Sequence, residues 1–261
     1  MRKTINRIGE VGYNNHGTKM IIIEYNSATD ITVEFQDERK YKVFHVLYSN
    51  FKNGMIRNPY DKTTYGVGYL GEGKYKIREN KNRTLAGVAW DSMMERCYSS
   101  KFKEKHPNYT DSYVCEEWHC FQNFAEWFYN NYYKINGQRM EVENNILLKN
   151  NKKYCPEYSI ISPQRINNLF VKMNNSKDRG KYCIGVTYNK QRNKYVGQYS
   201  YIDINGKYKR VSKDFKTEKE AFEFYKKNKE EYIKSVANEY KGLIPENLYN
   251  AMQEYKIEIT D

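Results

Sequence analysis

Apolar segments between polar turns predict strands in the first sixty residues of the chain. Three segments rich in β-branched and aromatic residues lie between turn signals: MIIIEY (20–25), ITVEF (31–35) and YKVFHVLYSNF (41–51). The polar stretch 26–30 between the first two segments is typical of a hairpin loop. The pattern therefore predicts a β-rich domain over residues 1–62, built as a small barrel or meander.

The pattern changes to a helical period in the middle of the chain. Apolar residues there recur at spacings of three and four positions, which is typical of helices with one buried face. The first stripe is formed by Trp90, Met93, Met94, Cys97 and Tyr98. The second stripe is formed by Trp118, Phe121, Ala125, Phe128 and Tyr132. We expect both helices, within residues 88–133, to pack into one core.

A strand, a turn and a helix are predicted within residues 140–171. Apolar positions at 142–147 predict the strand, and an Asn- and Lys-rich turn follows at 149–154. Ser162 is suited to cap the helix, with Pro163 at its first position. This segment is therefore a short hairpin followed by a helix.

Three strands and a helix are predicted after a linker-like stretch at residues 174–181. The strands are IGVTY, KYVGQYSYI and KRVSKDF, and Asn205-Gly206 between the last two is a strong hairpin signal. Thr217 and Glu220 have the spacing of a capping box, which starts the helix. The predicted fold class is therefore α+β, with a domain over 1–62, a helical and ββα domain over 63–175, and a sheet-plus-helix domain over 176–261.

The charge of the chain predicts a polyanionic partner. The 44 Lys and Arg residues outnumber 32 Asp and Glu, which gives a net charge of +12. Residues 177–216 hold eleven Lys or Arg against three Asp, whereas residues 217–261 hold seven Lys against ten acids. This partition predicts a sheet with its exposed face on phosphates and a helix packed behind it. On charge alone, an anionic membrane surface is the rival partner.

We expect a cytoplasmic protein with reduced thiols and no membrane partner. No segment reaches the roughly 18 apolar residues of a spanning helix, and the start MRKTINRIGEV has no apolar signal core. Five cysteines without a secretion signal favour free thiols. Cys115 and Cys120 lie near His106 and His119, at the edge of zinc spacing, but no second close pair completes a site, so buried thiols are the favoured interpretation.

The last third of the chain resembles the AP2 DNA-binding domain. The resemblance is carried, in order, by Gly185-Val186, Tyr195, Phe215, Thr217, Glu218, Ala221 and Tyr225. It implies a three-stranded sheet that lies on the major groove of double-stranded DNA. The contacts it implies on the first two strands fall near Thr187, Asn189, Arg192, Lys194, Gln198 and Ser200. The predicted DNA-binding residues are Lys190, Arg192, Lys194, Gln198, Lys207, Lys209 and Arg210.

The middle of the chain resembles phage-encoded HNH or homing endonucleases. Three motifs carry this likeness: W-x-x-M-x-x-R-C-Y at 90–98, V-C-x-x-W-x-x-F-x-x-F at 114–124, and Y-x-P-E with P-Q-x-I-N between 154 and 167. The first sixty residues resemble the β-rich leader of the same proteins, so the likeness covers nearly the whole chain. The resemblance implies a nuclease site on the hairpin and its helix.

Such a site needs a base near neutral pKa, one metal ion, usually Mg²⁺, and an Asn on the helix. The candidate catalytic residues are Glu143, Asn145, Asn167 and His119, with Glu143 as the metal ligand. No histidine occurs after His119, so the usual base is missing from the hairpin. Arg96 and Arg165 are candidates for clamping a phosphate, and His106 is a weaker candidate for the base.

The predicted function is therefore that of a phage-type protein that binds double-stranded DNA in the cytoplasm of a host cell. Metal-dependent nicking is one hypothesis, with Mg²⁺ as the cofactor. General base catalysis contributes about 10²–10⁴-fold, so its loss predicts weak or absent cutting. The alternative is an inactive regulator, or an inhibitor of a host defence nuclease of the anti-CRISPR or anti-restriction type, with no cofactor and a host defence protein as partner. RNA binding is a third hypothesis, without an RNA-module signature.

Overall fold

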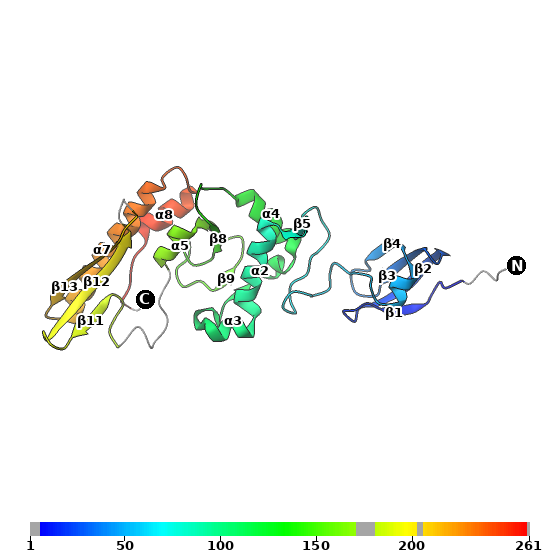
Figure 1. The fold of residues 1–261 in the computed structure, drawn as a ribbon, viewed down its shortest axis with the longest axis horizontal. Coiled ribbons are helices and arrows are strands. Elements are labelled where there is room, and N and C mark those ends of the chain that lie inside the picture. The colour runs from blue at the N-terminus through cyan, green and yellow to red at the C-terminus, as the bar shows by residue number, and fades with distance from the viewer. Residues whose placement is uncertain (1–5, 171–180, 203–205, 260–261) are drawn as a thin grey trace. The chain divides into compact units, whose positions relative to one another are not determined.

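The protein is a mixture of helices and several small sheets (Figure 1), which confirms the α+β class. The structure, a computed structural model, describes residues 6–170, 181–202 and 206–259. Contacts divide the chain into two compact units. Unit 1 contains Met1–Glu95 and Glu116–Glu126, and unit 2 contains Arg96–Cys115 and Trp127–Asp261. The three-domain division stays a prediction, and most of the predicted linker at 174–181 lies outside the described residues.

The first part of unit 1 is the predicted meander. Four antiparallel strands lie in the order β1 (Val11–Tyr13), β2 (Lys19–Ser27), β3 (Asp30–Phe35) and β4 (Lys42–Val46). Strands β2 and β3 contribute most of a core formed by Met20, Ile22, Ile31, Val33, Phe35, Val46, Phe51 and Ile56. The polar stretch 26–30 contains the turn between these two strands, as predicted.

The predicted strand 41–51 is wrong in its second half. The chain leaves the sheet after Val46 and forms a short helix, α1 (Tyr48–Lys52). This helix returns Phe51 to the core, where its ring lies so close to Gly12 that a Cβ there would be 2.9 Å from it. A straight continuation of the strand would carry Phe51 away from the apolar cluster, so burial of its ring favours the helix.

The second part of unit 1 contains the predicted helical stripes. Helix α2 (Leu85–Tyr98) follows a short hairpin of β5 (Arg78–Glu79) and β6 (Asn82–Arg83), and helix α4 (Phe121–Asn131) follows the 3₁₀ turn η2 (Glu116–His119). Both helices run from unit 1 into unit 2.

Burial confirms that the two apolar stripes face a core. Trp90, Met93 and Met94 of α2 are fully buried, and so are Trp118 and Phe121 of the second stripe. The Trp90 indole donates a hydrogen bond of 2.8 Å to the carbonyl oxygen of Trp118, and the Trp90 ring meets the Phe121 ring edge to face. A buried indole N–H needs such an acceptor.

In unit 2 the predicted hairpin pairs differently from the expectation. Strand β8 (Met140–Glu143) pairs antiparallel with β10 (Ile160–Pro163), which leads directly into helix α5 (Gln164–Phe170). The strand predicted over 142–147 ends at Glu143, because the chain bends there to bury Ile146.

The segment between these strands forms a separate small ladder. Strand β9 (Lys153–Tyr154) pairs parallel with β7 (Tyr113–Val114), which follows helix α3 (Ser100–Lys105) and the 3₁₀ turn η1 (Pro107–Tyr109). The turn predicted at 149–154 therefore ends in a short strand rather than leading back along β8.

The predicted cap of helix α5 is wrong. Ser162 and Pro163 are the last residues of β10, and the helix begins at Gln164. The Ser162 hydroxyl is fully buried and has no hydrogen-bond partner among the described residues. Pairing of β10 with β8 fixes Ser162 in an extended ladder opposite Glu141, which prevents it from capping.

The C-terminal sheet and its helix match the prediction closely. Strands β11 (Val186–Asn189), β12 (Lys194–Ile202) and β13 (Tyr208–Phe215) form an antiparallel sheet, and α7 (Glu218–Glu239) lies along one face of it (Figure 1). The Thr217–Glu220 capping box is present in both directions. Residues 203–205 of the predicted hairpin turn lie outside the described residues, but the ladder continues from Ile202–Tyr208 onward.

Helix α7 belongs to two cores. Its first turns contribute Ala221 and Phe222 to a cluster with Val186 of the sheet. Its later turns pack against the hairpin and α5, together with helix α8 (Glu246–Glu254). This second cluster is formed by Ile146, Ile160, Ile166, Phe170, Ile233, Val236, Ala237, Tyr240, Ile244, Leu248 and Met252. Residues on both sides of position 175 therefore share one core.

Close approach of α7 to the sheet depends on Gly197. A Cβ at this position would lie 2.4 Å from the carbonyl oxygen of Ala221, which is backbone and has little freedom to move. We expect Gly197→Ala to lower the free energy of unfolding by more than about 1 kcal/mol. Urea denaturation followed by circular dichroism measures the change, with Ser212→Ala on the exposed strand β13 as a matched control. Equal stability of both variants would contradict the packing described for α7.

Candidate nucleic-acid interface and carboxylate cluster

The sheet β11–β13 has one covered face and one outer face. Successive residues of a strand point to opposite faces. Gly197 and Tyr199 face α7, because the missing Cβ of Gly197 points at Ala221 and the Tyr199 ring meets the Phe224 ring. The outer face of the two longer strands is formed by Lys194, Val196, Gln198, Ser200, Ile202, Tyr208, Arg210, Ser212 and Asp214. Strand β11 adds Thr187 and Asn189.

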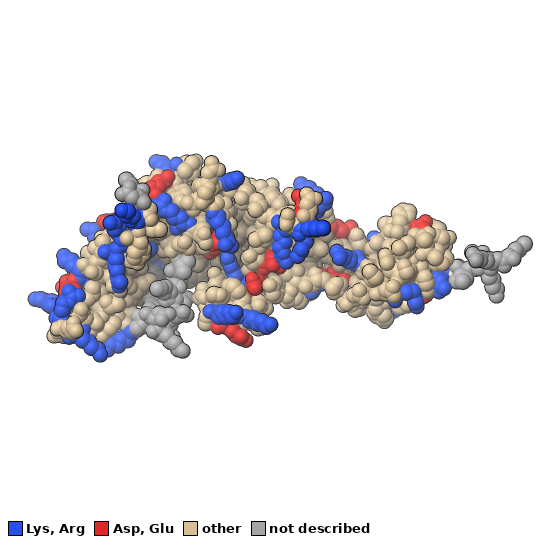
Figure 2. All heavy atoms as spheres, in the orientation of Figure 1, with Lys and Arg blue, Asp and Glu red and all other residues tan. Residues whose placement is uncertain are grey.

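The prediction that the positive charge gathers on one exposed face is wrong in part. Lys194 and Arg210 lie on the outer face, but Lys209 is next to Arg210 in the strand and therefore points toward the helix side. Arg192 pairs with Asp214 at 2.8 Å, which neutralises one of the predicted phosphate contacts. On the face drawn in Figure 2, Lys and Arg side chains over this sheet are separated by uncharged residues, with acidic side chains among them.

The remaining predicted contacts lie at the ends of the strands. Lys190 follows β11 and Lys207 precedes β13, and both are exposed. The Arg210 guanidinium donates to the Gln198 side-chain oxygen, so these two predicted residues are in contact across β12 and β13. The outer face is thus mainly a polar surface of amides and hydroxyls with two cations on it and others at its rim. Such a surface can form hydrogen bonds to both phosphates and base edges.

A second candidate site is a carboxylate cluster on β8. Glu141 and Glu143 are two residues apart on a strand and therefore point to the same side. Glu143 is 5% exposed, and its carboxylate lies 3.8 Å from the Arg96 guanidinium. Glu141 accepts a hydrogen bond of 2.7 Å from the Asn167 amide and pairs with Arg139 at 3.3 Å. Helices α2 and α5 thus both meet β8 through polar groups.

Burial changes the protonation of this cluster. Removal from water, together with the neighbouring Glu141 charge, raises the pKa of Glu143 from 4.5 to about 7, against the opposing effects of the Arg96 charge and the Asn167 hydrogen bond. The Arg96 pKa is raised above its ordinary value. Burial acts against that shift, but Tyr154 and Glu143 outweigh it. Glu143 therefore titrates near neutral pH, while Arg96 remains charged.

The structure brings together two of the four predicted catalytic residues. Glu143 and Asn167 meet around Glu141, which had not been predicted although its spacing from Glu143 places both on one face. Asn145 is exposed in the bend after β8. His119 belongs to unit 1, where its backbone carbonyl accepts from the Tyr69 amide. The part played by Arg96 depends on a contact between α2 and β8, which no local pattern reveals.

The cluster does not fit a metal ion well. Glu143 already faces the Arg96 guanidinium, and both Glu141 oxygens are engaged by Asn167 and Arg139. Within residues 6–170, 181–202 and 206–259, no three His, Cys, Asp or Glu side chains gather as a metal site would require. A divalent cation placed here would meet two guanidinium groups, which repel it.

The five cysteines are free thiols in the structure. Cys97, Cys120 and Cys155 are buried, and Cys115 and Cys183 are half-buried. Burial raises the pKa of the Cys97 thiol to about 12, which keeps it protonated and unreactive.

The chain matches no protein-family model, no curated protein and no solved structure. Among the described residues, no helix combines the length and the apolar character that crossing a membrane requires.

The raised pKa of Glu143 makes the stability of the fold depend on pH. Because the folded pKa is higher than the unfolded one, the contribution of Glu143 to stability is complete below pH 4.5 and is lost as the pH rises to about 7. Between pH 5 and pH 8 this loss amounts to about 1–3 kcal/mol of folding free energy, and we expect Glu143→Gln to remove it. Melting temperatures at both pH values measure it, with the exposed Glu223→Gln as control. The same pH dependence in Glu143→Gln and in the original protein would contradict the assignment.

Proposed function

We propose that this chain binds double-stranded DNA through the outer face of β11–β13 and does not itself cut it. The observation that carries the proposal is the arrangement of this sheet. Helix α7 covers one face, whereas the other presents exposed or half-exposed polar side chains such as Thr187, Gln198 and Ser212. A polar sheet surface of this kind, with cations on it and at its rim, suits a duplex whose backbone carries the charge.

The charge of the chain supports a polyanionic partner. The net charge is +12, and the sheet segment supplies much of the excess. Lys194 and Arg210 are the outer-face cations that would meet phosphates, with Lys190 and Lys207 at the ends of the strands. The resemblance of residues 185–225 to the AP2 domain supports the same surface. Because Lys209 points to the other face, we do not assign it a contact.

The carboxylate cluster supports binding without cleavage. Two arginines and an amide contact its carboxylate oxygens. These polar contacts join β8 to α2 and α5, so the cluster connects these elements rather than forming a metal site. A DNA-binding protein with this property would act as a regulator. Whether it acts on DNA alone or on a host nuclease as well is decided by partner-capture experiments with the full chain.

Duplex binding should depend on the outer-face cations and on salt. We expect the double substitution Lys194→Ala with Arg210→Ala to weaken binding to a 30-bp duplex by about tenfold or more, and to reduce the slope of log K against log salt by about 1–2. Fluorescence anisotropy at several salt concentrations measures both values. Lys213→Ala removes a cation from the same strand on the helix-facing side and serves as the control. Equal losses in the double variant and in the control would contradict the assigned face.

Supercoiled plasmid incubated with the full chain and Mg²⁺ or Mn²⁺ should stay intact. The reason is that the carboxylates of Glu141 and Glu143 are already paired with arginines. Agarose gels detect any nicked product, and Glu143→Gln provides the matched variant. Nicking by the original protein that disappears in Glu143→Gln would overturn the non-cutting proposal and identify a nuclease.

A further inference from the structure

A cleft of about 420 Å³ opens within unit 2 beside the far end of the C-terminal sheet. It lies among the segment before β8, helix α5, the ends of β12 and β13, and helix α7. Its volume is within the roughly 300–1,000 Å³ of small-molecule sites. The side chains that matter for its chemistry are Arg139, Arg165, Tyr201, Tyr208, Lys229 and Tyr232. None of these was among the DNA-binding residues predicted on the sheet, although Arg165 was a candidate for clamping a phosphate.

Lys229 is the unusual member of this set. Arg139 is paired with Glu141 and Arg165 with Glu239, whereas Lys229 has no acidic partner among the described residues. Its ammonium lies 5.7 Å from the centre of the Tyr232 ring. Burial lowers the pKa of Lys229, because no neighbouring acid offsets the loss of water. A desolvated cation that lacks a counter-charge is a place where an anionic ligand gains binding energy.

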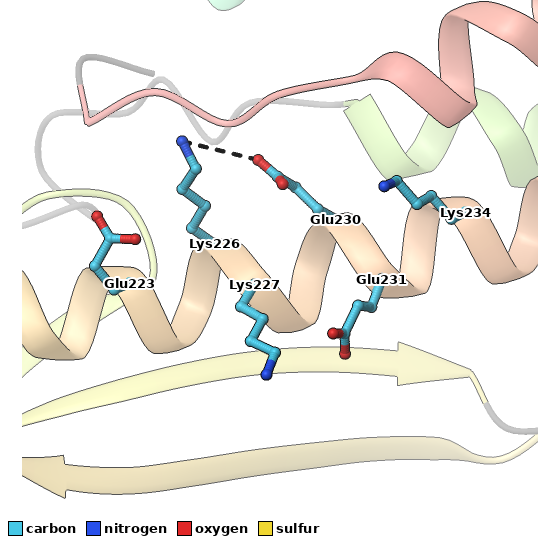
Figure 3. Close-up of a pocket in the computed structure, with 6 residues that line it drawn as sticks. All are labelled: Glu223, Lys226, Lys227, Glu230, Glu231 and Lys234. Carbon is cyan, nitrogen blue, oxygen red and sulfur yellow. Dashed lines mark ion pairs between the residues drawn. The ribbon is translucent and has the colours of Figure 1, made fainter.

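Other lysines of α7 lie on a charged surface of the helix, and their surroundings differ from those of Lys229. Figure 3 shows acids and lysines interspersed along this surface: Glu223, Lys226, Lys227, Glu230, Glu231 and Lys234. Lys226 pairs with Glu230 at 3.9 Å, and Lys256 approaches the same carboxylate at 3.7 Å. Lys227 is exposed and lies two residues from Lys229. Lys227 also has no ion pair among the described residues, but it is exposed, whereas Lys229 is half-buried in the cleft.

Two tyrosine rings in the cleft are held in place by hydrogen bonds. The Tyr232 hydroxyl accepts from the Ile202 amide at 3.1 Å, and the Tyr208 hydroxyl donates to the Ser200 hydroxyl at 2.6 Å. Tyr208 is nevertheless 70% exposed, so most of its ring is open to a ligand. Fixed aromatic rings stack on nucleic-acid bases without sequence preference, because every base has a flat face.

We propose that this cleft binds a nucleoside phosphate, with the phosphate on Lys229 and the base against the ring of Tyr208. The ligand comes either as a free nucleotide or as the terminal unit of a nucleic-acid strand. The chemistry is the same for both: a dianionic group with several acceptor oxygens beside a flat ring. The inference goes beyond duplex binding on the outer face. Tyr208 belongs to both surfaces, whereas Lys229, which would hold the phosphate, does not belong to the outer face.

The test measures binding of four probes to the full chain by calorimetry and thermal shift. The probes are thymidine, thymidine 5′-monophosphate, inorganic phosphate and an eight-residue thymidine oligonucleotide that carries a 5′-phosphate. We expect the monophosphate or the oligonucleotide to bind and thymidine not to bind at the same concentration. Tighter binding of the monophosphate identifies a free nucleotide as the ligand, and tighter binding of the oligonucleotide identifies a strand end.

Lys229→Met should weaken binding of the probe at least about tenfold, because a charge-assisted hydrogen bond is lost. Its melting temperature without ligand should equal or exceed that of the original protein, since an unpaired desolvated charge is removed. Lys227→Met is the matched control and should bind normally. Tyr208→Leu, a change at an exposed position, should weaken binding of the nucleotide but not binding of inorganic phosphate.

Three results would overturn the proposal: no probe binds, thymidine binds as well as its monophosphate, or Lys229→Met binds as tightly as Lys227→Met. The Lys194→Ala and Arg210→Ala double variant separates this inference from the duplex proposal. It should bind the nucleotide probe normally even where duplex binding is lost.

Discussion

Helix α7 makes two sets of contacts at once, and the positions of the outer sheet face and of the cleft depend on them. Its first half lies on the sheet, where Gly197 allows the backbones to approach and Ala221 and Phe222 fill the space behind Val186. Its second half buries Ile233 and Val236 among the apolar residues of the hairpin and α5. A helix of 22 residues has turns enough to serve both cores. Each core alone is small, so the shared helix stabilises both.

The position of α7 decides which surfaces remain open. Because the helix covers one face of the sheet, the other face is left with side chains that hydrogen-bond outward. The strand alternation then distributes the cations between the two faces, so that the excess of positive charge in the sequence becomes a moderately charged, mainly polar surface. The helix also carries Lys229 into the cleft beside the sheet, where none of the described lining residues is an acid. The open face and the cleft are thus both consequences of the same packing.

Local patterns were sufficient to predict the elements of the C-terminal sheet but not the ion pairs that its charged side chains form. The alternation in KYVGQYSYI and the Thr217–Glu220 spacing are encoded within a few residues, and the structure has both as expected. The division of Lys209 and Arg210 between faces follows from the strand itself and was available from the sequence. The ion pair between Arg192 and Asp214 joins residues 22 positions apart and was not.

The carboxylate cluster depends even more on contacts between residues that are far apart in the sequence. The sequence pointed to Glu143 and Asn167, and the structure places them around one strand. The pairing of β8 with β10, the contact of Arg96 with Glu143, and the near-neutral pKa of that acid all arise from residues brought together over long stretches of chain. The end of the first predicted hairpin strand depended on burial of Ile146, which is also a tertiary effect. Tertiary contacts therefore place the predicted residues Glu143 and Asn167 in a cluster with arginines.

The most direct measurement of the central claim is a backbone NMR titration of the full, isotope-labelled chain with duplex DNA at low salt. If the outer face meets the duplex, the largest shifts and line broadening will fall on Thr187, Gln198, Ser200 and Arg210, while the residues of β1–β4 change little. Shifts that spare β11–β13 and concentrate elsewhere in the chain would contradict the account.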